Sequence, residues 1–233
     1  MSPVTSTATI EADGFVWARR FVGPEQIAEL ITALTALEMD SARAGVRDLL
    51  SRCPAVKKFA TSRPLTQWVN PILGGESFVV RALLFDKTPV ANWRVAWHQD
   101  VTIAVREQRA APGFGPWSFK DGIPHAHAPA ILLERMLTLR LHLDDCDKSN
   151  GALRVLSGSH RGGKLDAKAI EEWKARGPNV QCVAQAGDAL LMRPLLLHAS
   201  SSADSPKHRR VIHLEFAADE LPDGLAWAQR ISA

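Results

Sequence analysis

The stretch VAWHQDVTIAV, residues 95–105, places a histidine and an aspartate two positions apart in a run that is otherwise mostly apolar and β-branched. This composition predicts a strand, in which alternate side chains share a face, so we expect His98, Asp100 and Thr102 to point the same way. A buried carboxylate needs a partner. A divalent metal ion is one candidate, and an ordinary histidine–aspartate hydrogen bond in a protein core is the other.

The rest of the chain predicts helices first and strands afterwards. Residues 24–38 begin with a proline and carry apolar side chains at helical spacing, which predicts an amphipathic helix. A shorter helical segment is expected at 42–51, and a helix at 166–176 with Ile170 and Trp173 facing inward. Strands are predicted at 77–86, 95–105, 136–144, 152–157, 179–184, 187–192 and 209–216.

This order of elements predicts one mostly β domain with flanking helices over residues 1–233. We expect a helical part at about 1–75 and a strand-rich core at about 76–217. Residues 106–134 are rich in glycine, proline and alanine and show no clear period, which predicts a lid-like loop.

Composition and charge exclude several classes of protein. The net charge is +3, and lysine and arginine are scattered without forming a block, so no nucleic-acid binding is predicted. Three separated cysteines without a CxxC pair are typical of a reducing cytoplasm. Neither a signal peptide nor an apolar run long enough to cross a membrane is visible, so we expect a soluble cytoplasmic protein. The oligomeric state cannot be predicted from these features.

A second histidine and a basic pair extend the opening motif. His198 lies near the end of an apolar run, and Arg209 and Arg210 follow at the start of a predicted strand. Two imidazoles and one carboxylate form the facial set that holds Fe(II) and leaves coordination positions open. In 2-oxoglutarate enzymes the far carboxylate of the cosubstrate needs a fixed cation, for which arginine is suited. Alternation favours Arg209 over Arg210 for this role.

A rival metal motif occurs in RLHLDD, where His142 and Asp144 have the same spacing. The longer interval from Asp100 to His198 leaves room for the strands that separate two ligand-bearing strands of a barrel, so we favour His98 and Asp100 as the metal pair. His142 is then expected to face the same cavity as Arg140, or to be a hydrogen-bonded histidine of the core.

Here the chain resembles the phytanoyl-CoA dioxygenase family of Fe(II)/2-oxoglutarate-dependent oxygenases. The resemblance runs from about residue 81 to residue 216. It depends on WHQD at 97–100, LDDCDKSNGALRVLSGSH at 143–160, GDALLMRPLLLHAS at 187–200 and HRRVIHLEF at 208–216.

The resemblance implies a double-stranded β-helix of the jelly-roll or cupin-like type, with helices packed on one side. It implies Fe(II) held by the residues matching His98, Asp100 and His198, with 2-oxoglutarate and O2 as cosubstrates. Arg209 matches the arginine that binds the far carboxylate of 2-oxoglutarate, and Ser200 matches a residue that helps to hold it. Arg140 stands near the cosubstrate where relatives often carry an aromatic residue, which is a departure from the family pattern.

The sequence thus predicts a dioxygenase that hydroxylates an unactivated C–H bond of a small molecule and releases succinate and CO2. Asp100 favours hydroxylation, since halogenating relatives replace this carboxylate with a small residue. A substrate with an anionic group is suggested by Arg81, Lys87 and Arg140, and the candidate substrate pocket comprises Arg81, Lys87, Thr102, His142 and His213. Two alternatives remain open: a metal-binding barrel that does not use 2-oxoglutarate or only senses a ligand, and a fold in which the three ligands never meet.

Overall fold

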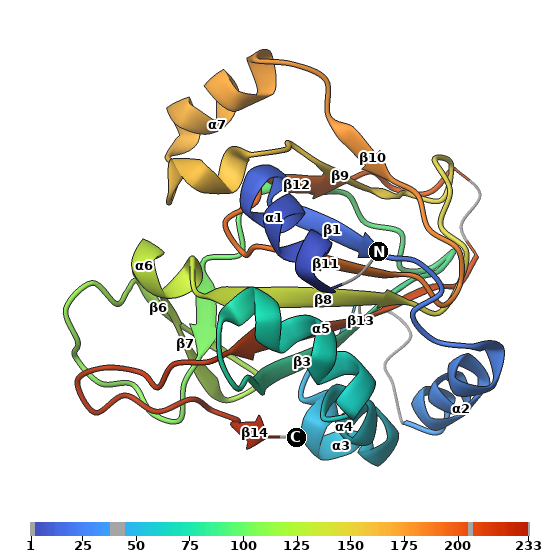
Figure 1. Ribbon diagram of the computed structural model, residues 1–233, viewed down its shortest axis with the longest axis horizontal. Coiled ribbons are helices and arrows are strands. Elements are labelled where there is room, and N and C mark those ends of the chain that lie inside the picture. The colour runs from blue at the N-terminus through green and yellow to red at the C-terminus, as the bar shows by residue number, and fades with distance from the viewer. Residues whose placement is uncertain (1–2, 38–44, 205–206, 233) are drawn as a thin grey trace.

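The computed structural model describes residues 3–37, 45–204 and 207–232, and all structural statements concern these residues. Two antiparallel sheets face each other, and a group of helices covers the outer face of the larger sheet (Figure 1). The helices are Pro3–Asp13 (α1), Pro24–Thr35 (α2), Leu49–Arg52 (α3), Pro54–Ala60 (α4), Arg63–Leu73 (α5), Ala130–Leu133 (α6) and Ala167–Ala175 (α7), with a 3-10 turn at Ser159–Gly162 (η1).

The larger sheet has seven strands in the order β1-β11-β8-β13-β3-β14, with β2 paired to β3. Its strands are Phe15–Ala18 (β1), Gly45–Val46 (β2), Phe78–Lys87 (β3), Met136–His142 (β8), Ala189–Met192 (β11), Arg209–Ala217 (β13) and Ile231–Ser232 (β14). All of their pairings are antiparallel, and the long strands β3, β13 and β8 lie side by side at its centre.

The smaller sheet has four strands in the order β10-β9-β12-β4, comprising Val95–His98 (β4), Leu153–Val155 (β9), Val180–Cys182 (β10) and His198–Ser200 (β12). A separate three-stranded sheet, β5-β7-β6, is formed by Thr102–Ala104 (β5), Trp117–Lys120 (β6) and Ile123–His127 (β7). Two facing antiparallel sheets with helices on one side form the double-stranded β-helix that the sequence predicted.

Alternation along the central strands separates an apolar outer face from a polar inner face. On β8 and β13 the outer face carries Leu139, Leu141, Leu214 and Phe216, which pack with helices α2 to α5 in the main hydrophobic cluster. Burial of such large apolar side chains contributes about 1.5–3 kcal/mol each, so this face anchors the helices to the sheet. Helix α5 lies in front of the central strands of the larger sheet in Figure 1, and α4 lies below them beside α3.

The inner face of the same strands carries polar groups that are nonetheless buried. On β8 these groups are Thr138, Arg140 and His142, and on β13 they include Arg209 and His213. Buried polar groups are costly unless they have partners, so their presence on the inner face indicates that the functional site lies inside the barrel.

Several elements differ from the sequence predictions. The expected strand at 95–105 is two strands, because β4 ends at His98 and β5 begins at Thr102. The predicted loop at 106–134 contains the β6–β7 hairpin and helix α6. Helix α7 has no buried residue, so Ile170 and Trp173 are only half-buried. Helix α2 ends at Thr35, and in the predicted helical segment 42–51 residues 45–46 form strand β2, so that α3 begins only at Leu49. Positions 38 and 42–44 of the two predicted helices lie outside the described residues.

None of the helices in the described ranges is long and apolar enough to cross a membrane.

His142 gives the barrel interior a pH dependence. Burial lowers the pKa of His142 from its ordinary value of 6.5 to about 3, and neither ring nitrogen has a hydrogen-bond partner among the described residues. As the pH falls below 6.5, the unfolded chain binds a proton at this residue and the folded protein does not. This difference lowers the free energy of unfolding by about 1.4 kcal/mol per pH unit, until the folded protein also binds the proton at about pH 3.

We expect His142→Leu to flatten this dependence. The free energy of unfolding, measured with urea at several pH values, should fall less steeply below pH 6.5 in the variant than in the wild type, by about 1.4 kcal/mol per pH unit. Above pH 6.5 the difference between the two proteins should be constant. Parallel curves over the whole range would show that His142 binds its proton equally well in both states.

Candidate active site

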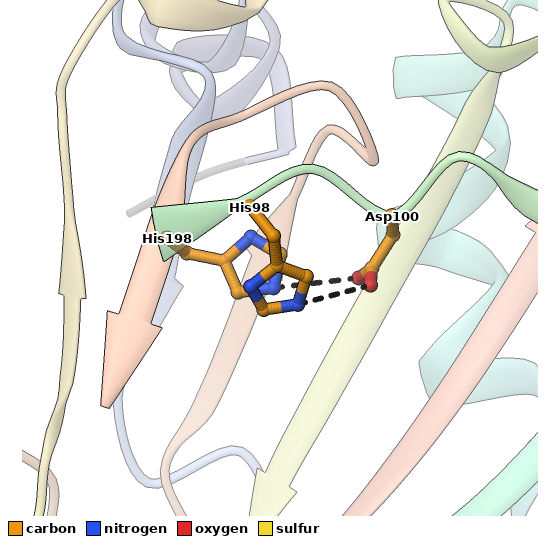
Figure 2. A group of neighbouring side chains, drawn as sticks. All are labelled: His98, Asp100 and His198. Atoms are coloured by element: carbon orange, nitrogen blue, oxygen red, sulfur yellow. Dashed lines mark ion pairs between the residues drawn. The ribbon is translucent and has the colours of Figure 1, made fainter. Parts of the chain in front are cut away.

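Three potential metal ligands meet at one end of the smaller sheet. His98 at the end of β4 lies directly opposite His198 at the start of β12 in the strand pairing, and their ring centroids are 4.2 Å apart. Asp100 follows in the break between β4 and β5, where its backbone N–H donates to the carbonyl of Pro194 at 2.9 Å. One ligand atom from each residue lies within 4.8 Å of the others. Figure 2 shows both imidazoles turned toward the carboxylate.

The hydrogen bonds of the two imidazoles leave the same nitrogen free in each ring. His98 Nδ1 donates to the carbonyl of Ala96 at 2.9 Å, and His198 Nδ1 donates to that of Leu196 at 2.8 Å. The Nε2 lone pairs therefore face Asp100, at 3.7 Å for His98 and 3.6 Å for His198. A backbone carbonyl that fixes the far nitrogen is the usual partner of a metal-binding histidine.

The charge states of these groups also suit a divalent cation. Burial lowers the pKa of His198 to about 4, so its imidazole is neutral at physiological pH. Burial alone would raise the pKa of Asp100, but the surrounding basic groups together, with His198 the foremost and Arg81 among them, outweigh it and hold the pKa well below its usual range. Asp100 Oδ2 is buried without a hydrogen-bond donor. A carboxylate oxygen and two imidazole nitrogens without partners fit a bound Fe(II) ion.

Gln99, between two of the ligands, holds the break in the strand. Its side-chain amide donates to the carbonyls of Leu195 at 2.7 Å and Gly163 at 2.8 Å, and accepts from the N–H of Leu165 at 2.8 Å. These partners lie far away in the sequence, so nothing near Gln99 could have revealed this role. Because β4 ends before Asp100, the carboxylate is placed by these contacts and not by the strand alternation that the sequence suggested.

A small inner cavity of about 150 Å³ lies beside the three ligands, between the two sheets. Arg140, Ser200, Arg209 and His213 line it. Arg209 is 4% exposed; one of its guanidinium nitrogens donates to the carbonyl of Gly151, and its buried Nε has no partner. The structure thus places all three predicted cosubstrate residues around one cavity.

Lys87 is also at this inner end of the barrel, although the sequence placed it with the substrate pocket. The side chain is fully buried; its Nζ donates to the carbonyl of Ser201 and lies 3.4 Å from Ser200 Oγ. Burial, assisted by the charge of Arg209, lowers the pKa of Lys87 to about 8. A lysine at the end of a strand gives no sign in sequence that it points inward.

Lys87, Arg140 and Arg209 together place three buried cations in one region. Among the residues that the structure describes, none of the three side chains forms an ion pair with a carboxylate. Burial lowers the pKa of Arg140 to about 10, which still leaves it charged at neutral pH. Buried charge without a counter-ion is costly, so this region is suited to a small anion.

A larger open cavity of about 730 Å³ reaches two of the three ligands, His98 and Asp100, from outside. Arg81, Thr102 and His213 from the predicted substrate pocket line it, and so do Lys120 and His127 from the β6–β7 hairpin. Only His213 of the pocket residues lines both cavities. The metal ligands therefore stand where a small inner space and a large outer space meet.

The two rivals of the predicted site residues have structural partners. Arg210 forms a two-point ion pair with Asp144, at 2.9 Å from Nε and 2.6 Å from the terminal nitrogen. The second histidine–aspartate motif is thus divided, since Asp144 contacts Arg210 on the outer side of β13. His142 lines neither cavity, and its ring lies 5.9 Å from that of Trp17.

The two histidine–aspartate motifs allow a matched test of the metal site. We expect His98→Leu to abolish stoichiometric Fe(II) binding, because the variant keeps only two of the three protein ligands of the proposed site. His142→Leu should keep full iron content. Anaerobic titration with Fe(II) followed by metal analysis of the desalted proteins measures both. Equal iron content in the two variants would contradict the assignment of the ligands.

Several solved structures share the fold of this chain. Among solved structures, EctD from S. alaskensis, crystallised with 2-oxoglutarate and 5-hydroxyectoine, has 19% sequence identity and a TM-score of 0.72, covering 93% of this chain and 77% of EctD. AviO1 from Streptomyces viridochromogenes Tue57 has 23% identity and a TM-score of 0.66, covering 95% of this chain and 97% of AviO1. The 2-oxoglutarate-dependent carbocyclase SnoK of nogalamycin biosynthesis has 14% identity and a TM-score of 0.72, covering 100% of this chain and 96% of SnoK.

Comparison with curated proteins gave no match. At the identities found for the solved structures, the likeness shows the fold. The family follows from a different comparison, in which residues 10–211, most of the chain, match the family model described as phytanoyl-CoA dioxygenase (PhyH). The chain therefore belongs to the phytanoyl-CoA dioxygenase family of Fe(II)- and 2-oxoglutarate-dependent oxygenases.

Proposed function

We propose that the protein hydroxylates an unactivated C–H bond of a small molecule that carries an anionic group, with consumption of 2-oxoglutarate and O2. The observation that carries this proposal is that His98 and Asp100, which form one site with His198, line both a small cationic cavity and a large open one. The family supplies the general kind of reaction. The two cavities supply separate places for cosubstrate and substrate.

His98, Asp100 and His198 would hold the iron and leave three positions for cosubstrate and oxygen. Iron bound there supplies the activation of O2, which the protein side chains cannot provide. In the balanced reaction, R–H, O2 and 2-oxoglutarate give R–OH, succinate and CO2, so that one oxygen atom enters the product and the other enters succinate. Asp100 keeps a carboxylate on the metal, which favours transfer of oxygen over transfer of a halide.

The inner cavity would bind 2-oxoglutarate through charge. Arg209 offers a buried guanidinium to the far carboxylate, with Ser200 and Lys87 beside it. Arg140 lines the same cavity, close enough to both Arg209 and Asp100 to interact with their charges. A dicarboxylate entering this region neutralises buried positive charge, which gives binding energy and excludes neutral molecules.

The open cavity would bind the substrate, and its charges favour an anion. Arg47 is paired with Asp121 at 3.1 Å, and Arg81 is paired with Glu215. No carboxylate among the described residues is paired with Lys120, which lines the same cavity. Burial lowers the pKa of Lys120, and the nearby charges of Arg81 and Arg47 lower it further. A positive potential that disfavours a lysine cation favours a carboxylate or phosphate of the substrate.

The matched pair Arg209 and Arg210 tests the cosubstrate site. Binding of 2-oxoglutarate to the anaerobic Fe(II) protein is followed by the visible metal-to-ligand charge-transfer band. We expect Arg209→Ala to raise the Kd for 2-oxoglutarate at least about tenfold, since a charge-assisted hydrogen bond contributes about 1.5–3 kcal/mol. Arg210→Ala should leave this Kd nearly unchanged, because Arg210 contacts Asp144. Bound iron without any band in the wild type would instead favour a metal-binding barrel of other chemistry.

Pairs of small carboxylic acids and their primary amides test the substrate class. We expect acids, but not the matching amides, to stimulate succinate formation from 2-oxoglutarate, with hydroxylated products identified by mass spectrometry. Lys120→Met should reduce the stimulation by subsaturating acid at least about tenfold, while Lys148→Met on an exposed turn should not. Equal stimulation by amides would contradict an anionic substrate, and products of unchanged oxygen content would contradict hydroxylation.

A further inference from the structure

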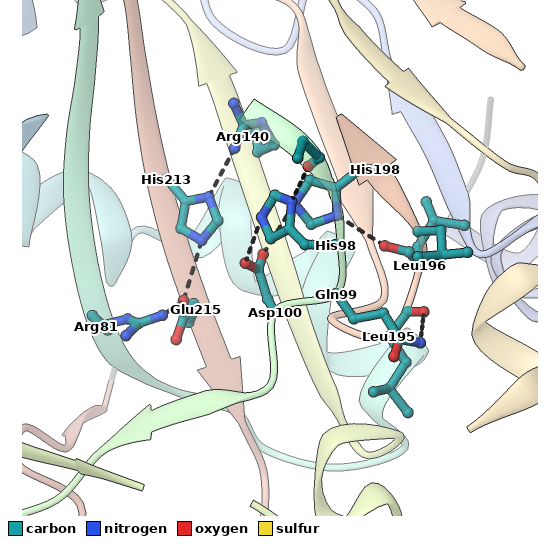
Figure 3. A network of polar contacts seen from close by, with 12 residues as sticks. Arg81, His98, Gln99, Asp100, Arg140, Leu195, Leu196, His198, His213 and Glu215 are labelled. Atoms are coloured by element: carbon teal, nitrogen blue, oxygen red, sulfur yellow. Dashed lines mark hydrogen bonds and ion pairs between the residues drawn. The ribbon is translucent and has the colours of Figure 1, made fainter. Parts of the chain in front are cut away.

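A chain of four polar side chains crosses the larger sheet from the open cavity to the inner one. Arg81 on β3, Glu215 and His213 on β13, and Arg140 on β8 lie in sequence across three neighbouring strands (Figure 3). The strand register places Glu215 opposite Arg81 and His213 opposite Arg140. Each contact in the chain is therefore made between cross-strand neighbours or along β13.

The donors in this chain determine the state of the imidazole. A guanidinium can only donate, so His213 Nδ1 accepts from Arg140 at 3.0 Å. The proton of the neutral ring is then on Nε2, which donates to Glu215 Oε1 at 3.2 Å. Arg81 donates to the same carboxylate oxygen. Glu215 thus fixes one tautomer of His213, and that tautomer presents an acceptor to Arg140.

The burial of these groups makes the arrangement rigid. His213 is 3% exposed, Glu215 4% and Arg140 7%. The ring of Phe85 lies 5.5 Å from that of His213 and 5.6 Å from the guanidinium carbon of Arg140. Arg140 is therefore held by one hydrogen bond and one ring contact, and both constrain its direction within the inner cavity.

The imidazole also separates a negative charge from a positive one. A carboxylate in direct contact with Arg140 would neutralise the guanidinium. With His213 between them, Glu215 orients Arg140 through a neutral acceptor, and the positive charge of Arg140 stays available to another anion. The anion within reach is the one that occupies the inner cavity, which Arg140 lines with Arg209.

We infer that His213 and Glu215 are positioning residues that hold the Arg140 guanidinium toward 2-oxoglutarate in the inner cavity. This inference rests on the proposed function, because the anion is its cosubstrate. His213 accepts from Arg140, Glu215 fixes the tautomer that allows this, and Arg140 contacts the cosubstrate. Neither His213 nor Glu215 needs to touch 2-oxoglutarate for its loss to weaken binding.

The test is a double-mutant cycle on cosubstrate binding. The Kd for 2-oxoglutarate is measured anaerobically with Fe(II) by calorimetry, and the Kd for Fe(II) is measured separately. We expect Arg140→Met and His213→Leu each to raise the Kd for 2-oxoglutarate about tenfold, and the double variant to be no worse than Arg140→Met alone. The Kd for Fe(II) should change less than about twofold. If the two effects multiply, His213 acts independently of Arg140 and the inference is wrong.

Two further variants separate orientation from simple loss of packing. His213→Asn offers its side-chain oxygen where Nδ1 lies, so it should return the Kd for 2-oxoglutarate to within about threefold of the wild type. Glu215→Gln keeps the size of the side chain but replaces the charged acceptor of the His213 Nε2–H group with a weaker, neutral one, so it should raise this Kd severalfold. This variant tests the inference separately if His213→Leu folds poorly. Wild-type Kd values in both His213→Leu and Glu215→Gln would overturn the inference while leaving the proposed function intact. A wild-type protein that binds Fe(II) but not 2-oxoglutarate would overturn both.

Discussion

The pairing of β4 with β12 is the contact on which the rest of the site depends. It sets His98 directly across from His198, so that two ligands from distant parts of the chain lie on neighbouring strands. The carboxylate follows from the same arrangement, because the end of β4 leaves Asp100 in a short break held by Gln99 and by the carbonyl of Pro194. Without this strand pair the smaller sheet would lack its edge, and the cavities would lose the point at which they meet.

The barrel interior separates charge into two regions. Toward the inner end, Arg140 and Arg209 line a small cavity, and Lys87 adds a third buried positive charge beside Ser200. Toward the open end, arginine side chains are already paired with Asp121 and Glu215. Under the proposed function, this difference would give the cosubstrate and the substrate different electrostatic environments. The larger sheet carries both regions on one face, while its other face binds the helices through apolar contacts.

The sequence predicted the fold and the family, and both are confirmed. The iron, 2-oxoglutarate and O2 expected from the resemblance are those of the family. The three predicted metal ligands, His98, Asp100 and His198, lie close together in the structure. The strand pairing of β4 with β12 brings them together. Their roles in binding remain predictions.

Other features depend on contacts that no local pattern reveals. Lys87 is fully buried, although a lysine before a turn normally indicates a solvated strand end. The sequence predicts a loop where the β6–β7 hairpin lies, because the glycines, prolines and alanines of the surrounding segment 106–134 obscure the alternation of its two short strands. The contacts of Glu215 with Arg81 and of His213 with Arg140 depend on the pairing of β13 with the adjacent strands, which the sequence does not show. Helix α7 has an apolar pattern but no core to bury it.

The separate sheet formed by β5, β6 and β7 has a consequence for how the enzyme could diversify. Its strands pair only with one another, and β6 and β7 contribute Lys120 and His127 to the open cavity without contributing to either barrel sheet or to the metal ligands. Under the proposed function, substitutions in this hairpin would change the wall of the substrate cavity while His98, Asp100 and His198 keep their support. The architecture is therefore modular: new substrate ranges can evolve, or be engineered, by exchanging one hairpin on a conserved catalytic scaffold.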